Sequence, residues 1–580
     1  MESNNIEPGK PDVGFAWRIL DVVLRGTFKH HETGEILLPF VVLRRLDCML
    51  EHSAADVRNQ AEQLRTQGFD EETVDRMLKS AAVGSDGKRL NFYNRSAYDL
   101  VKLAQDPQNI KFNFSAYLHG FSENVQEIMR FFQLERALVR LERNGLLFKL
   151  IDEVSRFDLS VETHDNHDMG LLFEELIRIS NEQSNETAGE HFTPRDVVKL
   201  MAAVLLEGEE ERLKEPGAIH KIYDLCCGTG GMLTVAKQSI LESHPSALVE
   251  IFGQEINEMA FAIAKSDLLI TGEDPNNIRL GNTITNDRHP EQKFHYMLAN
   301  PPYGVNWAKD KAEVALDLTG RYHDTPRTSD GQFLFLQHMI SKMKHPSEGG
   351  GRIAVITNGS PLFTGDAGSG ESNIRKWIIE NDRLEALIAL PGDLFFNTGI
   401  STYIWVLSNR KSANRKGRVQ LIDAADMGSS LKKSLNNKRK EISDKAREAI
   451  LKLYGTTEDI DGVKWFSNEY FGYTKVMIEQ PLKENGQVVT NRQGEPKPDS
   501  SLRDYERVPL TEDIETYFNR EVQPHLPESW VEWDKNKVGY EINFTKYFYT
   551  YKPLRSLQEI TSDLMRLEEE SQDLLSQIVE

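Results

Sequence analysis

The feature that most constrains the fold of this chain is a regular alternation of short β-rich apolar runs with helical stretches, which begins near residue 185. The β-rich runs cover 221–227, 249–255, 294–302, 351–359, 384–392 and 402–408, and helices are expected from Met232, from Met259 and over 373–379. Strands alternating with helices imply βαβ units and a mostly parallel sheet covered on both faces. We therefore predict an α/β fold with its ligand crevice at the C-terminal ends of the strands.

The two ends of the chain have a different texture. Over residues 1–165, apolar residues recur at helical spacing, for example Phe15, Ile19, Val22 and Val23, which predicts a helical N-terminal domain. The last 25 or so residues repeat apolar positions in sevens, with Leu557, Leu564 and Ile578 in one register and Ile560, Leu567 and Leu574 in the other. We expect domains at 1–165, 166–420 and 421–580, the last ending in a coiled-coil-forming helix.

The composition indicates the kind of cellular compartment in which the chain is expected. Its three cysteines, Cys48, Cys226 and Cys227, form no CxxC pattern and no disulfide framework, as expected in a reducing cytoplasm. No signal peptide is visible, and no apolar run approaches the roughly 18 residues that a membrane span needs. Residues 411–452 are rich in Lys and Arg, and the polar cluster 483–501 predicts a surface loop.

The sharpest motif is Asn300-Pro301-Pro302-Tyr303, which directly follows an apolar run. Proline has no N–H for the strand ladder, so the strand must stop and present the Asn300 side chain at its C-terminal edge. There the side-chain carbonyl of Asn300 and the backbone carbonyl of Pro301 could accept hydrogen bonds from an aromatic amine such as that of adenine, and so favour its attack on a methyl donor. Tyr303 offers a face on which a base can stack. Taken alone, the motif also fits a structural Pro-Pro turn.

A glycine-rich turn lies upstream of this motif. Asp224 is followed by Gly228, Thr229, Gly230 and Gly231, and such glycines let a cofactor approach the backbone closely. The turn is not a P-loop, because no Lys-Ser/Thr pair follows, and it fits a dinucleotide fingerprint poorly.

Three further positions could complete a cofactor site. Glu255 ends the next strand, where an acid can accept both ribose hydroxyls, although a solvated strand end would look the same. Asn282 follows the third strand unit, where its amide could meet the cofactor's adenine, or belong to an ordinary loop. Residues 190–195 precede a helix, with Thr193 expected as the N-cap and Pro194 in the first turn.

In this order, the segments EHFTPR, DLCCGTGG, Glu255, GNT and NPPY resemble the amino-methyltransferases of DNA. More narrowly, the chain resembles the modification subunit of type I restriction-modification systems, with further matching runs in GLLFEELIRI, SDGQFLFLQHMI and ALPGDLFFNTGISTYIWVLSN. The resemblance covers nearly the whole chain. It implies a Rossmann-like, S-adenosyl-L-methionine-dependent methyltransferase core over 166–420 that methylates the N6 amine of adenine in a specific DNA sequence and needs no metal.

The resemblance also assigns site residues. It makes Asn300, Pro301, Pro302 and Tyr303 the catalytic tetrad. The residues that it implies for binding S-adenosyl-L-methionine are Glu190, His191, Phe192, Thr193, Pro194, Arg195, Asp224, Gly228, Thr229, Gly230, Gly231, Glu255 and Asn282. Many related enzymes have Asp where this chain has Asn282.

The implied partners are DNA with a flipped adenine, a specificity subunit, a second copy of the modification subunit and a restriction or translocase subunit. A DNA-binding chain usually offers net positive charge to the phosphates, whereas this chain has a net charge of −21. The charge therefore favours a partner that supplies most of the DNA contacts. Three alternatives remain open: a single-chain adenine methyltransferase, an inactive methyltransferase-like scaffold, and an enzyme that methylates protein glutamine, which also uses Asn-Pro-Pro-Tyr.

Overall fold

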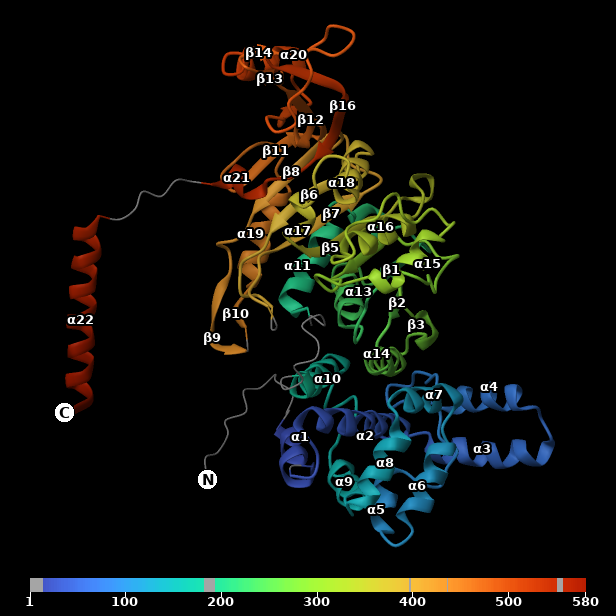
Figure 1. Cartoon of the computed structure of the whole chain (residues 1–580). Coiled ribbons are helices and arrows are strands. Elements are labelled where there is room, and N and C mark those ends of the chain that lie inside the picture. The colour runs from blue at the N-terminus through green and yellow to red at the C-terminus, as the bar shows by residue number, and fades with distance from the viewer. Residues whose placement is uncertain are drawn as a thin grey trace. The chain divides into compact units, whose positions relative to one another are not determined.

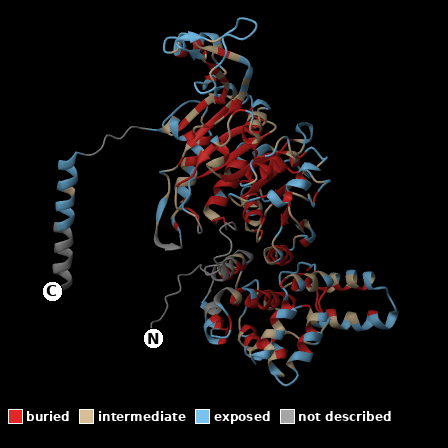
Figure 2. Ribbon diagram, viewed as in Figure 1, coloured by how far each residue is buried: buried red, intermediate tan, exposed pale blue. Residues whose placement is uncertain are grey.

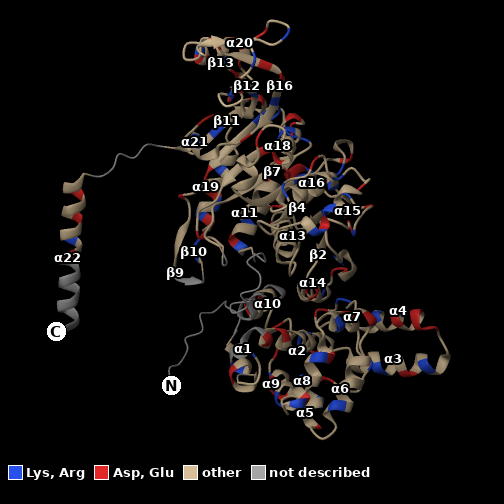
Figure 3. Ribbon diagram, viewed as in Figure 1, with Lys and Arg blue, Asp and Glu red and all other residues tan. Residues whose placement is uncertain are grey.

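The computed structural model of the chain describes residues 14–24, 26–181, 193–395, 398–435, 437–549 and 556–579. Contacts divide the chain into two compact units, Met1–Glu541 and Ile542–Glu580 (Figure 1). Figure 3 shows that acidic and basic residues are intermixed along the helices and strands. No helix within the described ranges is long and apolar enough to cross a membrane.

The first unit begins with a helical region, as the apolar spacing predicts. It contains α1 (Gly14–Ile19), a π-helical turn (Leu20–Leu24), α2 (His30–Leu50), α3 (Ala54–Gln67), α4 (Glu71–Ala81), α5 (Leu100–Gln105), α6 (Ile110–His119), α7 (Glu123–Phe131), α8 (Leu134–Arg143), α9 (Leu147–Ser155) and α10 (Asn166–Asn181). Helix α2 is almost wholly buried, and its fully buried Arg45 donates to the backbone carbonyls of Leu159 and His164 at 2.6 and 2.8 Å. These bonds fix the segment that leads into α10.

A nine-stranded sheet follows, and it confirms the α/β prediction. Its strands are β1 (Ile219–Asp224), β2 (Leu248–Glu255), β3 (Ile278–Leu280), β4 (Tyr296–Ala299), β5 (Arg352–Asn358), β6 (Leu384–Ala389), β7 (Thr402–Ser408), β8 (Arg418–Asp423) and β11 (Val463–Ser467). They are ordered β11-β8-β6-β7-β5-β4-β1-β2-β3. Strands β3, β2, β1, β4 and β5 run parallel, whereas β7 is antiparallel to both of its neighbours, β5 and β6.

Helices cover both faces of this sheet. The chain moves from β1 to β2 in one direction along the sheet and from β4 to β5 in the other, so right-handed connections place their helices on opposite faces. One face carries α13 (Gly231–Ser243) and α14 (Glu258–Thr271), together with α11 (Arg195–Leu206), which packs on α13. The other carries α16 (Gln332–Lys342) and α18 (Gly370–Glu380). The strands are mostly buried between these layers (Figure 2).

Shorter elements complete the unit. Helices α12 (Glu210–Leu213), α15 (Lys311–Ala315), α17 (Ser360–Phe363) and α19 (Asp444–Tyr454) lie in connections, and β9 (Ser429–Leu435) pairs with β10 (Lys438–Glu441). A separate antiparallel sheet of β15 (Asp504–Pro509), β12 (Gly472–Glu479) and β16 (Trp530–Tyr540) has a small core of its own with α20 (Ile514–Tyr517). The polar segment expected to be a loop includes the short hairpin β13 (Lys483–Glu484) and β14 (Gln487–Val488).

The second unit contains α21 (Phe544–Phe548) and the terminal helix α22 (Leu557–Val579). The expected C-terminal helix is therefore present. Its described apolar side chains are exposed, including those of Leu557, Ile560, Leu564 and Leu567.

Candidate active site

Three of the residues singled out by the sequence meet at one edge of the nine-stranded sheet. Asp224 ends β1, Glu255 ends β2 and Asn300 directly follows β4. These strands are parallel neighbours in the order β4-β1-β2, so their C-terminal ends lie together. Each of the three side chains is less than a tenth exposed. The edge therefore gathers two carboxyl groups and one amide in a buried setting.

The glycine-rich turn that follows β1 is shaped by backbone conformations that favour glycine. Gly228 has a φ of 53° and Gly230 a φ of 85°, both in the left-handed region that costs other residues strain. A Cβ on Gly230 would also lie 3.4 Å from the Ala264 side chain of α14. The turn delivers the chain into α13 with Gly230 as its N-cap and with no side chain capping the helix. Nothing lies within 4 Å of a Cβ built on Gly228, so the turn leaves space beside its backbone at this position.

Glu255 holds this turn against the next strand. Its Oε2 accepts a hydrogen bond from the Gly228 N–H at 2.7 Å, and its Oε1 accepts from the N–H groups of Ile256 and Asn257 at 2.8 Å each. The carboxylate therefore joins the loop after β1 to the loop after β2. This excludes the alternative of a merely solvated strand end.

Asp224 is the least satisfied acid of the edge. It is 1% exposed, its Oδ1 accepts from the Cys226 N–H at 3.0 Å, and its Oδ2 has no hydrogen-bond partner. Burial, and after it the nearby charge of Glu255, raises the pKa of Asp224 to about 7. A buried, unpaired carboxyl oxygen at a glycine-rich turn is suited to a cationic ligand group.

Asn300 is held from two sides. Its Nδ2 donates to Thr193 Oγ1 at 2.9 Å, while its Oδ1 accepts from the hydroxyl of Tyr303 at 2.8 Å. Threonine and tyrosine hydroxyls can each donate or accept a hydrogen bond, so this pair of partners holds the amide of Asn300 firmly in place. Burial also raises the pKa of Tyr303, which keeps this phenol protonated and able to donate.

The start of α11 differs from the sequence prediction. The helix begins at Arg195 with Pro194 as its N-cap, and no side chain caps it, so the assignment of Thr193 as N-cap is wrong. The hydroxyl of Thr193 bonds the side chain of Asn300 instead, 107 residues away in sequence. Glu190, His191 and Phe192 lie outside the described residues.

Asn282 lies in the loop after β3, and both ends of its amide are used locally. Its Oδ1 accepts from the Ile284 N–H at 3.0 Å and its Nδ2 donates to Asp310 Oδ1 at 3.2 Å. These bonds join the loop after β3 to the segment that follows the tetrad. They give Asn282 a structural task, and a ligand contact would have to share its amide.

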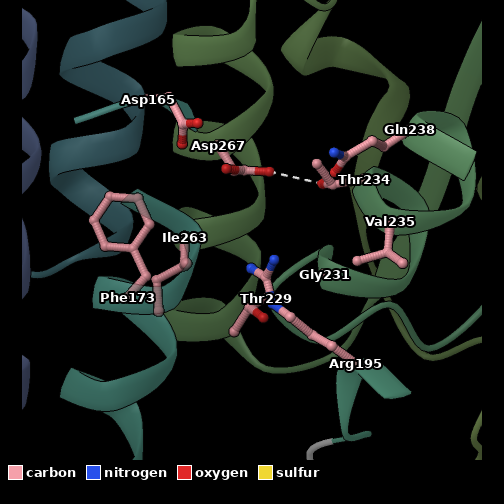
Figure 4. A pocket seen from close by; sticks show the side chains of 11 residues that line it. Asp165, Phe173, Arg195, Thr229, Gly231, Thr234, Val235, Gln238, Ile263 and Asp267 are labelled. Carbon is pink, nitrogen blue, oxygen red and sulfur yellow. Dashed lines mark hydrogen bonds between the residues drawn. The ribbon is translucent and has the colours of Figure 1, made fainter. Parts of the chain in front are cut away.

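A cavity of about 320 Å³ lies beside the glycine-rich turn (Figure 4). It brings together predicted residues from two distant segments, because Thr229 and Gly231 line it together with Arg195, whose guanidinium is directed into it. On its helical side, a Cβ at Gly170 of α10 would lie 2.7 Å from Arg195 Nη2. Arg195 thus joins the predicted turn to the N-terminal region.

Sequence reasoning missed the other polar residues of this cavity. Thr234 and Gln238 follow Gly231 at helical spacing, and Asp267 interrupts the apolar run of α14. Asp267 accepts from Thr234 Oγ1 at 2.9 Å, and burial raises its pKa to about 6. The available signal was the run Lys265-Ser266-Asp267, which interrupts an otherwise mostly apolar helix. Among the described residues, no group of His, Cys, Asp and Glu is arranged to hold a metal ion.

Comparison with known proteins agrees with this arrangement. Residues 164–491 match the model of the N-6 DNA methylase family, and residues 14–154 match the HsdM N-terminal domain. The type I restriction enzyme MjaIX methylase subunit of Methanocaldococcus jannaschii is 26% identical over 59% of this chain and 58% of its own length. The HindI methylase subunit of Haemophilus influenzae is 31% identical over 45% of this chain and 55% of its own length. The chain thus spans between half and two thirds of these relatives.

Solved structures show the same fold. The type I restriction-modification methyltransferase subunit from Streptococcus thermophilus aligns with a TM-score of 0.61 and 24% identity, covering 79% of this chain and 96% of that one. The matched N-6 DNA methylase model spans more than half of the chain and includes every described residue of the strand edge. The chain belongs to the N-6 DNA methylase family.

Proposed function

We propose that this chain transfers a methyl group from S-adenosyl-L-methionine to the N6 amine of adenine in a specific DNA sequence, as the modification subunit of a type I restriction-modification complex that protects host DNA. The observation that carries the proposal is the placement of Asn300. Its amide is buried directly after β4, at the sheet edge that also holds Asp224 and Glu255, and it is held there by Thr193 and Tyr303.

The chemistry follows from that placement. The lone pair of an adenine amine is delocalised into the ring, which makes the nitrogen a poor nucleophile. Hydrogen bonds from this NH2 to Asn300 Oδ1 and to the backbone carbonyl of Pro301 favour the tetrahedral nitrogen that forms during attack. Tyr303 donates to the same Oδ1 and keeps the carbonyl in place. This is stabilisation of a transition state by fixed acceptors, with no covalent bond to the protein.

The residues of the strand edge fit S-adenosyl-L-methionine, which supplies an activated methyl group on a sulfonium when bound. The unpaired Oδ2 of Asp224 suits its amino group, and Glu255 suits its ribose hydroxyls. The open backbone of the turn at Gly228 and Gly230 allows close approach. Arg195, Thr229 and Gly231 line the cavity beside this turn.

Partners follow from charge and from the last helix. A chain with a net charge of −21 repels DNA, and α22 exposes Leu557, Ile560, Leu564 and Leu567. A specificity subunit that reads the bases and binds α22 would supply the DNA contacts that this acidic chain lacks and would cover the exposed apolar side chains of the helix. The curated relatives are methylase subunits of type I restriction enzymes, which supports assembly with a specificity subunit, a second copy of this chain and a restriction or translocase subunit.

The test is methyl transfer by the chain purified together with its specificity subunit. Tritium from labelled S-adenosyl-L-methionine should appear in duplex DNA as N6-methyladenine, and sequencing of modified bases should place it at one recognition sequence. Tritium found in protein glutamine would instead identify a protein methyltransferase. If isothermal titration shows no cofactor binding, the chain is an inactive scaffold. If this chain alone methylates a specific DNA site, it is a single-chain enzyme.

A further inference from the structure

The hairpin of β9 and β10 stands apart from the nine-stranded sheet (Figure 1). Residues 429–441 read SSLKKSLNNKRKE, which places five basic residues and one acidic residue in a chain whose net charge is −21. A two-stranded hairpin is marginally stable in isolation, so its position depends on its contacts with the rest of the chain. Its charge is opposite to that of the chain as a whole.

Strand β10 and the residue that follows it are tied to α11. Lys438 is buried and its Nζ donates to both carboxylate oxygens of Asp196, at 3.1 and 3.2 Å. The N–H of Ile442 donates to the same carboxylate at 2.7 Å. Asp196 is the second residue of α11, three positions after Thr193, which bonds Asn300. Strand β10 is therefore anchored to a helix that begins two residues after the threonine that bonds Asn300.

The same strand is also tied to the loop after β6. The N–H groups of Arg439 and Lys440 both donate to the carbonyl of Asp393, at 2.8 and 3.1 Å. This loop follows the C-terminal end of β6, which is parallel to β8. Arg439 is exposed and Lys440 partly so, and no described acidic side chain pairs with either, in contrast to Lys438. Two cations are thus presented to solvent from an anchored backbone.

We propose that the β9–β10 hairpin binds the phosphate backbone of duplex DNA beside the adenine that is methylated, an inference that rests on the proposed function. Phosphates are neutralised by accessible Lys and Arg side chains, and such contacts set where a protein sits on a duplex without reading its sequence. The hairpin supplies these cations from a strand that is tied to Asp196, three residues after the Thr193 that bonds Asn300, whereas the acidic remainder of the chain would repel the duplex. It positions the DNA, while base reading is left to the partner.

The test compares two double variants, each in complex with the specificity subunit. The hairpin variant is Arg439→Gln/Lys440→Gln. The matched control is Lys445→Gln/Lys452→Gln, which removes the same charge from exposed positions of α19. Binding to a fluorescent duplex carrying the recognition sequence is measured between 50 and 200 mM salt, together with affinity for S-adenosyl-L-methionine.

The hairpin variant should weaken DNA binding about tenfold or more at low salt and reduce the slope of log K against log salt by about 0.9 for each lost phosphate contact. Cofactor affinity and complex formation should be unchanged, and the control should match the wild type. An unchanged salt slope would overturn the proposal, and loss of the specificity subunit would show instead that the hairpin docks protein. A wild-type complex that fails to methylate any DNA would contradict the proposed function itself.

Discussion

At the scale of single residues, Asn300 is the side chain that we propose acts on the adenine amine, and its amide is held by hydrogen bonds to Thr193 and Tyr303. Asn300→Ala should lower the turnover of methyl transfer by more than about 100-fold, as expected when one preorganised polar group is removed from a transition-state site. Affinity for S-adenosyl-L-methionine should stay nearly unchanged. Single-turnover kinetics and equilibrium dialysis measure the two quantities. Asn306→Ala, on the exposed part of the same loop, is the matched control, and a variant at position 300 with wild-type turnover would contradict the tetrad assignment.

Thr193 offers a finer test of the same amide. Thr193→Val removes the acceptor of the Asn300 NH2 group but keeps the shape of the side chain. One neutral hydrogen bond is worth about 0.5–1.5 kcal/mol, so kcat should fall about 3- to 10-fold. Thr193→Ser retains the hydroxyl and should restore most of the rate. Equal loss in both variants would show that packing at this position matters and the hydroxyl does not.

Asp224 predicts how cofactor binding depends on pH. Its pKa is raised to about 7, so in the unliganded protein the carboxyl is neutral below this pH and ionised above it. A cationic ligand group favours the ionised form, so binding below pH 7 must release a proton. Affinity for S-adenosyl-L-methionine should therefore fall as the pH is lowered from about 7 to 5.5, by at most about tenfold per unit. Isothermal titration in Asp224→Asn should give weaker binding without this dependence, and a pH dependence that persists in the variant would assign the proton to another group.

At the scale of elements, Glu255 joins the turn after β1 to the start of α14 through three backbone N–H groups. Glu255→Ala should raise the dissociation constant of S-adenosyl-L-methionine about 10- to 100-fold, since hydrogen bonds to a charged group contribute about 1.5–3 kcal/mol. Glu258→Ala, an exposed change three residues later, is the control. If equilibrium dialysis shows unchanged cofactor binding, then Glu255 does not contact the cofactor and serves only to hold the two loops together.

The elements also show what the sequence could predict. The strands ending at Asp224 and Glu255, and the one before Asn300, are signalled by local apolar runs and abrupt turns, and the structure confirms them. The antiparallel insertion of β7 between β5 and β6 depends on pairing between distant segments, which a local pattern does not encode. The same holds for the sheet of β15, β12 and β16.

The candidate site shows the same division. Its carboxyl groups and amide were found because motifs mark them. The hydrogen bond from Asn300 to Thr193 was not predicted, because a threonine that precedes a helix is commonly its N-cap, and the sequence favoured that interpretation. The cavity residues Thr234 and Asp267 meet only once α13 and α14 pack together.

At the scale of the whole molecule, the contacts divide the chain into Met1–Glu541 and Ile542–Glu580, and we propose that the second unit serves assembly. All described residues of the strand edge belong to the first unit, whereas α22 belongs to the second. A helix whose apolar side chains are exposed over several turns lacks the burial that stabilises most helices in water, so a partner is expected to cover it.

Ending the chain after Pro553 should therefore leave the first unit folded and able to bind S-adenosyl-L-methionine, but should abolish the complex with the specificity subunit and sequence-specific methylation. Size-exclusion chromatography of the mixed subunits reports the complex, and isothermal titration reports the cofactor. A point version in the full chain, Ile560→Asp/Leu567→Asp, should act like the truncation, because it places charge in the seven-residue repeat. Its control, Glu559→Ala/Arg566→Ala, changes charged positions of the same turns and should assemble normally. An undiminished complex with the truncated chain would show that α22 is not the docking helix and that the acidic first unit holds its partner through another surface.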